Sequence, residues 1–169
     1  MDRASGPTGE AMTLKNEVAS SVGTSSASAA SLTDRWVALA PYFLSVLRIA
    51  AAFLFMEYGT AKLFAFPAAL LPGGGTAPLA SLPGIAGLLE TVGGLLLLLG
   101  LFTRPVAFLL SGQMAIAYWF FHAPHGFWPI LNHGDPAVLF CFIWLYVSAA
   151  GAGPWSIDAL RWRSSARAG

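Results

Sequence analysis

Residues 83–101 read PGIAGLLETVGGLLLLLGL and carry a single charged side chain, that of Glu90. A helix of about 20 apolar residues crosses the hydrocarbon core of a membrane, so this segment predicts a transmembrane helix. Glycine and proline separate it from its neighbours, and only a short turn leads into the next apolar run. The sequence has three further runs of this kind, at residues 37–64, 105–121 and 136–152. The pattern predicts an all-α membrane protein, a four-transmembrane-helix antiparallel bundle.

The composition of the whole chain agrees with a membrane protein. Of its 169 residues, 56% are hydrophobic and 10% are charged, and the mean hydropathy is +0.66. An average soluble domain has roughly 25% charged residues, so this chain has too few to cover a water-facing surface, which argues against a soluble enzyme. The net charge of +1 gives no sign of a nucleic-acid partner. The one cysteine, Cys141, excludes a disulfide or dithiol centre within the chain.

Polar residues divide the chain into three parts. Residues 1–35 are rich in Ser, Ala, Gly and charged side chains, and too poor in apolar area to offset the entropy of ordering them. We therefore expect a flexible, disordered N-terminal tail there. Residues 36–158 form the predicted four-helix transmembrane domain. Residues 159–169 form a second, basic tail.

Basic residues predict the orientation in the membrane. Cytoplasmic loops carry an excess of Lys and Arg, and a four-span bundle places seven of the nine such residues on one side. These seven are Arg3, Lys15, Arg35, Arg104, Arg161, Arg163 and Arg167. Both termini are therefore expected in the cytoplasm, and the lipid bilayer of a bacterial cytoplasmic membrane is the expected surrounding.

Four ionisable residues lie within the apolar runs: Arg48, Glu57, Lys62 and Glu90. A charge at the bilayer centre costs about 2.5–3.5 kcal/mol, so each needs a partner or a cavity. Helical spacing places Arg48 and Lys62 on one face, with Glu57 nearly opposite Arg48. Arg48 and Glu90 are expected to meet near the midplane. Three interpretations remain open: an ion pair that fixes helix register, a polar lining for a ligand or proton path, and an arginine that reaches the headgroups.

The connection before the last run is rich in polar and aromatic side chains. If the neighbouring helix faces point inward, five residues gather with Lys62 and Glu57 at the outward end of the bundle: Tyr118, His122, Asn132, Asp135 and Tyr146. Packed aromatic side chains alone would also produce these faces, and this is our interpretation of Tyr146. Imidazole and carboxylate groups suit zinc, copper or iron, which makes a metal site conceivable at His122, His125, His133 and Asp135. Pro124 interrupts the helix that would stack the first two histidines. The alternative is a set of interfacial histidines in an aromatic loop.

Residues 48–158 resemble the DoxX family of small four-helix membrane proteins. The resemblance is carried by Arg48 together with GTAKLF at 59–64, GLLETVGG at 87–94, GLFTR at 100–104, GFWP at 126–129, NHGD at 132–135 and GAGPWSID at 151–158. Two departures stand out. Family members commonly have Asn-Gly-Gly-Glu in place of NHGD, and they commonly have His or another polar residue near Tyr58, where this chain has Glu57.

The resemblance implies a membrane subunit associated with a redox system. Some relatives are similar to a subunit of thiosulfate:quinone oxidoreductase, and others are linked to oxidative-stress complexes. The family motifs favour Arg48, Lys62, Glu90, Asn132 and Asp135 as functional positions. Our leading hypothesis is a subunit that contacts a quinone or a partner oxidoreductase, and any enzymatic role would be that of such a subunit. The alternatives are a structural or assembly protein, and metal or small-solute handling through the histidine-rich loop.

Overall fold

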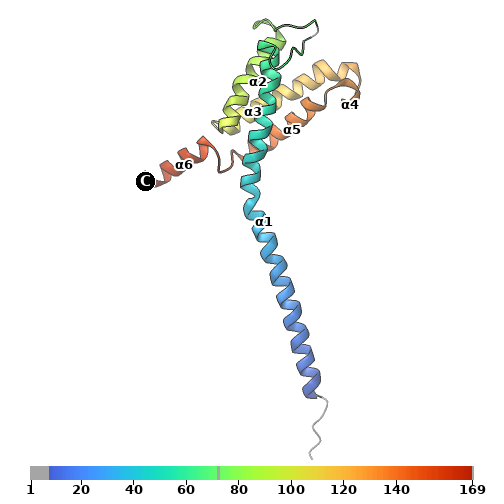
Figure 1. Ribbon diagram of the computed structural model, residues 1–169, viewed down its shortest axis with the longest axis vertical. Coiled ribbons are helices and arrows are strands. Elements are labelled where there is room, and N and C mark those ends of the chain that lie inside the picture. Colours follow the sequence, from blue (N-terminus) through green and yellow to red (C-terminus); the bar gives the residue numbers. More distant parts are fainter. Residues whose placement is uncertain (1–7, 72, 169) are drawn as a thin grey trace, which may run out of the picture. The chain divides into compact units, whose positions relative to one another are not determined.

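The computed structural model describes residues 8–71 and 73–168, and every regular element in these ranges is a helix (Figure 1). The all-α class is thereby confirmed. The elements follow in the order α1 (Thr8–Phe64), α2 (Leu82–Leu99), α3 (Thr103–Ala117), the π-helix η1 (Tyr118–His122), the 3-10 helix η2 (Ala123–His125), α4 (Pro129–Asn132), α5 (Asp135–Ala150) and α6 (Ile157–Ala168).

The chain divides into two units, Met1–Ala40 and Pro41–Gly169, and α1 contributes to both. In the first unit the backbone is helical from Thr8 onward, whereas the sequence predicted a flexible tail over residues 1–35. Ala recurs between Thr8 and Ala40 and no proline interrupts this range, so the backbone can stay helical there. Residues 1–7 of the predicted tail lie outside the described residues.

The apolar runs form helices of membrane-spanning character. Three segments are long and apolar enough to cross a bilayer: Leu32–Phe64, Leu82–Leu99 and Thr103–His125. The fourth predicted span is α5, an apolar helix of 16 residues, which extends about 24 Å at 1.5 Å per residue. The predicted basic tail is α6 up to Ala168, and Gly169 lies outside the described residues.

Local signals explain where the helices begin and end. The Ser81 hydroxyl caps α2 by accepting a hydrogen bond from the Gly84 amide at 3.2 Å. Gly100 ends α2 in the left-handed conformation, with φ of 67°, which glycine adopts without strain. Asp158 accepts hydrogen bonds from the amides of Phe102 and Thr103, at 3.0 and 2.8 Å, where α3 starts. The C-terminal segment thus fixes the α2–α3 turn.

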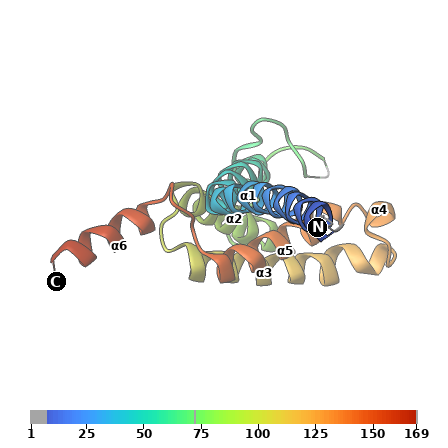
Figure 2. The same cartoon turned by 90° about the horizontal axis from the view of Figure 1, so that it is seen from below.

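The core of the second unit lies between α1, α3 and α5, and α3 and α5 run side by side in both views (Figures 1 and 2). Phe55 and Trp144 are almost completely buried, and their rings meet edge to face with centroids 5.5 Å apart.

Glycine brings α1 close to α2. A side chain at Gly59 would put its Cβ 2.4 Å from the Thr91 hydroxyl and 2.8 Å from the Gly87 carbonyl, so only glycine allows this approach.

Candidate functional site

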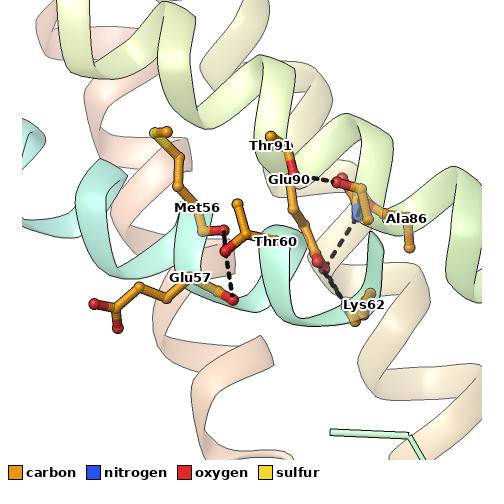
Figure 3. Close-up of polar contacts among 9 residues, drawn as sticks. Met56, Glu57, Thr60, Lys62, Ala86, Glu90 and Thr91 are labelled. Atoms are coloured by element: carbon orange, nitrogen blue, oxygen red, sulfur yellow. Dashed lines mark hydrogen bonds and ion pairs between the residues drawn. The ribbon is translucent and has the colours of Figure 1, made fainter. Parts of the chain in front are cut away.

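An ion pair between α1 and α2 lies inside the bundle (Figure 3). Lys62 Nζ is 2.6 Å from each carboxylate oxygen of Glu90. The Glu90 side chain is 3% exposed and that of Lys62 is 22% exposed. From α3, Gln113 Nε2 lies 3.5 Å from Glu90 Oε1 and 3.4 Å from the Ala86 carbonyl. We call Lys62, Glu90 and Gln113 the carboxylate cluster; it connects three helices through one buried acid.

Sequence reasoning identified Lys62 and Glu90 but missed Gln113. The amide belongs to α3, where it is surrounded in sequence by small and apolar residues. An amide in an apolar span needs a partner for the same reason that a charge does. A glutamine within an apolar run is therefore expected to face the inside of the bundle, and Gln113 could have been identified on that ground. Its partner could not be read from the sequence.

Arg48 does not contact Glu90, and the predicted ion pair between them is wrong. The Arg48 side chain is completely buried, and it donates hydrogen bonds to four backbone carbonyls. Two of these belong to the end of α2, Leu97 and Leu98, and two to the segment after α5, Ala152 and Trp155. The hydrogen bonds measure 2.9 Å to Ala152, 2.8 Å to Leu98 and 2.6 Å to Trp155.

The register of α1 against α2 explains this difference. The two helices are antiparallel, with Gly59 beside Thr91 and Met56 beside Gly94. Moving further toward the N-terminus of α1 therefore means moving further toward the C-terminus of α2. Arg48 reaches carbonyls in the last turn of α2, which carry the negative end of the helix dipole; the Leu97 carbonyl also accepts from the Gly100 amide at 3.1 Å.

The same end of the bundle holds Arg104 and Asp158. Arg104 Nη1 donates to the carbonyls of Ser148 and Ala149, at 3.2 and 2.6 Å, and so caps the C-terminal turn of α5. Burial raises the pKa of Asp158, but the amides of Thr103 and Phe102, the Thr103 side chain and the charge of Arg161 outweigh burial. The net result is a pKa of the Asp158 carboxyl below its usual value.

We expect acidification to remove the contribution of Asp158 to stability. Because its pKa is lower in the folded chain, that contribution is fully present above the unfolded value of about 3.9 and is lost as the pH falls through the folded pKa. Asp158→Asn should therefore lower the melting temperature at pH 7, and the difference from the natural chain should shrink below about pH 4. Thermal unfolding in detergent across this range measures it.

The matched control for this prediction is Asp34→Asn, on an exposed part of α1. It removes the same charge and should leave the melting temperature unchanged at every pH. A difference between Asp158→Asn and the natural chain that stays constant from pH 7 to pH 3 would contradict the assignment.

A groove of about 590 Å³ runs along α1 and α5. Most of its lining is apolar, including Leu54, Leu139 and Phe140, and the segment after α1 contributes as well. The polar residues along it are Glu57, Tyr58 and Asp135. The Glu57 carboxylate points away from the carboxylate cluster (Figure 3). This volume is typical of sites for small organic molecules, and its apolar character suits a ligand that enters from the lipid.

Tyr118 and Asn132 hold the loop before α5. The Tyr118 hydroxyl donates to the Phe127 carbonyl. Asn132 Nδ2 donates to the Gly126 carbonyl at 2.5 Å, and its Oδ1 accepts from the Gly134 amide at 2.8 Å. All three partners are backbone atoms, so these side chains fasten the loop and set the start of α5 at Asp135.

Gly134 completes this arrangement within the NHGD motif. A Cβ there would lie 2.6 Å from Asn132 Oδ1 and 2.8 Å from the Tyr118 ring, which leaves no room for a side chain. Tyr146, which the sequence grouped with the outward polar residues, is instead exposed on α5. Asn132 and Gly134 of the motif thus hold the loop in its conformation, whereas Asp135 lines the groove.

The histidines do not converge. His122 Nδ1 lies 3.0 Å from the Asn132 carbonyl, and His125 Nδ1 lies 3.0 Å from the Phe121 carbonyl. Within residues 8–71 and 73–168, no three His, Cys, Asp or Glu side chains form a group that could hold a metal ion. The metal site at His122, His125, His133 and Asp135 therefore stays a prediction from the sequence, without support from this geometry.

Comparisons with known proteins agree with this architecture. The DoxX family model matches residues 43–123. A protein of Haemophilus influenzae (strain Rd), described as an uncharacterized protein, is 46% identical over 121 residues, which cover 70% of this chain and 90% of that relative. The search of solved structures gave no significant match.

Proposed function

Since the chain belongs to the DoxX family of membrane proteins, we propose that it is a redox-associated subunit that binds a quinone in the groove along α1 and α5. The groove is the observation that carries this proposal. An isoprenoid quinone has a long apolar tail and a ring with two polar oxygens. The apolar lining suits the tail, and Tyr58, which lines the same groove, has a hydroxyl of the kind that donates to a quinone carbonyl.

The polar residues of the groove have a defined role in this proposal. Reduction of a quinone to a quinol takes two electrons and two protons. A partner oxidoreductase supplies the electrons. The carboxylates of Glu57 and Asp135 accept hydrogen bonds from the two hydroxyls of the quinol and exchange protons with them. The carboxylate cluster and Arg48 hold α1, which forms one wall of the groove, in register with α2.

We place this subunit in the bacterial cytoplasmic membrane, with both termini in the cytoplasm. Three basic residues support this orientation: Arg104 at the start of α3, and Arg161 and Arg163 on α6, after α5. The histidine-rich connection before α5 then faces outward. A quinone in the groove is reached from within the bilayer in this arrangement.

A substitution that fills the groove tests the proposal. Ala50 lines the groove, and Ala50→Trp should weaken binding of a short-chain quinone analogue to the full chain in nanodiscs by at least about tenfold, because the indole occupies the space of the ring. Equilibrium titration measures the affinity. The matched control is Val46→Trp, one turn earlier on α1 and exposed, but outside the groove lining. Equal affinity of the two variants, or no saturable binding to the natural chain, would refute the proposal.

A structural or assembly role is the second candidate, and one observation favours it. The buried charges of Arg48, Lys62 and Glu90 are all bonded to other parts of the chain. Side chains with protein partners of this kind suffice to stabilise a bundle without any ligand. Unchanged quinone affinity in Ala50→Trp, together with normal folding, would leave this role as the better account.

A further inference from the structure

A positively charged and aromatic surface lies where α3 begins and α6 leaves the bundle. Both views show α6 extending to the side of α2, α3 and α5 (Figures 1 and 2). The exposed side chains here are Arg104 at the start of α3, and Leu160, Trp162 and Arg163 on α6. Trp162 is 80% exposed, which is unusual for the largest apolar side chain. We call Arg104, Arg161, Trp162 and Arg163 the basic surface.

Arg104 has donors left for an anion. Both of its hydrogen bonds to α5 carbonyls come from Nη1. Nε and Nη2 form the other edge of the guanidinium plane, the pair of donors that binds two oxygens of a phosphate at once. A groove of about 400 Å³ lies beside it, lined also by Phe102 and Trp162. A phosphate group with its attached glycerol fits such a space.

The lining of this groove has one positive and one negative side chain, Arg104 and Asp158, and two further arginines lie beside it on α6. Asp158 also lines it, but its carboxylate accepts hydrogen bonds from the amides of Phe102 and Thr103. Arg161 places its guanidinium carbon 5.4 Å from the centre of the Phe102 ring, and Arg163 follows on the same helix. Three surface arginines therefore lie near one acid, which already accepts two backbone hydrogen bonds and interacts with the charge of Arg161.

We propose that the basic surface binds the phosphate headgroup of an anionic phospholipid. A membrane-spanning bundle necessarily has lipid headgroups around its ends, and Trp is enriched at that level because its ring is apolar and its N–H is polar. Trp162 and Leu160 provide the apolar contact with the lipid chains, and the arginines provide the charge. α6 then lies along the membrane surface. This site is separate from the quinone groove and does not depend on it.

The test uses the full chain in a neutral detergent, titrated with short-chain phosphatidylglycerol, phosphatidylcholine or inorganic phosphate. We expect phosphatidylglycerol to bind at least tenfold more tightly than phosphatidylcholine, and this preference to weaken as salt is added. Binding is measured by native mass spectrometry and by the rise in melting temperature. Equal affinity for the two lipids overturns the proposal. Inorganic phosphate that competes as well as phosphatidylglycerol shows a site for soluble anions and also overturns it.

Two variants locate the site, and a third controls for charge. Arg163→Gln should weaken phosphatidylglycerol binding about fivefold, the effect of one arginine near a membrane surface. Arg104→Lys keeps the charge but loses the paired donors, and should weaken it several-fold. Arg163 is exposed on α6, so its variant should fold even if the Arg104 variant does not. Arg35→Gln removes the same charge from α1 and should have no effect. Equal losses in Arg35→Gln and Arg163→Gln would indicate general attraction and refute the site.

Discussion

Replacing Arg48 by methionine is expected to lower the free energy of unfolding by about 4–5 kcal/mol, which is a large effect for one residue. The guanidinium donates to four carbonyls and is completely buried. Methionine fills much of the same space but donates nothing. The carbonyls at the end of α2 and after α5 would therefore lose this donor, and the Leu97 carbonyl would keep only the Gly100 amide. Each such loss costs about 1–3 kcal/mol, and the losses are not fully additive.

The measurement is equilibrium unfolding of the full chain in mixed micelles, followed by circular dichroism. Arg48→Lys provides a graded comparison, because an ammonium keeps the charge but cannot reach carbonyls of two segments in a planar fork. It should recover only part of the loss, and it also gives a readout if the methionine variant does not accumulate. Arg35→Met, on the exposed part of α1, should change stability by less than about 0.5 kcal/mol. If the free energy of unfolding of the methionine variant is within about 1 kcal/mol of that of the natural chain, the hydrogen bonds of Arg48 contribute little to stability and the prediction is wrong.

The Arg48 result also shows which part of the structure the sequence could predict. Helical spacing placed Arg48 and Lys62 on one face of α1, and both do point to the helix α2. Their partners depend on how far α1 and α2 slide along each other. That register is set by close contacts at Gly59 and Gly94, which a count of residues from assumed membrane boundaries does not contain.

The candidate site shows the same limit. The apolar runs sufficed to predict the helices, because spanning a bilayer requires long runs of apolar residues. Asn132 was identified from a motif, but its bonds to Gly126 and Gly134 depend on the path of the loop. The groove depends on side chains from α1, α5 and the segment between α1 and α2. The sequence did group Glu57 and Asp135 at the outward end, but together with Lys62, Tyr118, Asn132 and Tyr146, none of which lines the groove.

The second large effect is expected at the carboxylate cluster. Lys62→Met leaves the carboxylate of Glu90 inside the bundle with only the distant amide of Gln113, and should lower the free energy of unfolding by about 3–5 kcal/mol. Glu90→Gln should cost less, because an amide is neutral and still accepts a hydrogen bond from Lys62. The same unfolding measurement in mixed micelles applies.

The double variant Lys62→Met/Glu90→Leu gives the decisive comparison. An apolar pair of similar size needs no partner, so the double variant should be more stable than Lys62→Met alone and close to the natural chain. Glu57→Leu is the control for loss of a carboxylate from α1, since that side chain points away from the cluster. If the double variant is no more stable than Lys62→Met, the two charges are not coupled, and the ion pair cannot account for the packing of α1 against α2.

The quinone affinity of the double variant then separates structure from function at this cluster. Lys62, Glu90 and Gln113 are absent from the groove lining, so a purely structural ion pair predicts normal stability together with normal quinone binding. Normal stability with weakened binding would mean that the buried charges act on the bound quinone through their field. The three bonds that Glu90 makes to Lys62 and Gln113 favour the structural result, because they leave the carboxylate engaged within the bundle. We therefore expect the double variant to fold and to bind the quinone analogue with unchanged affinity.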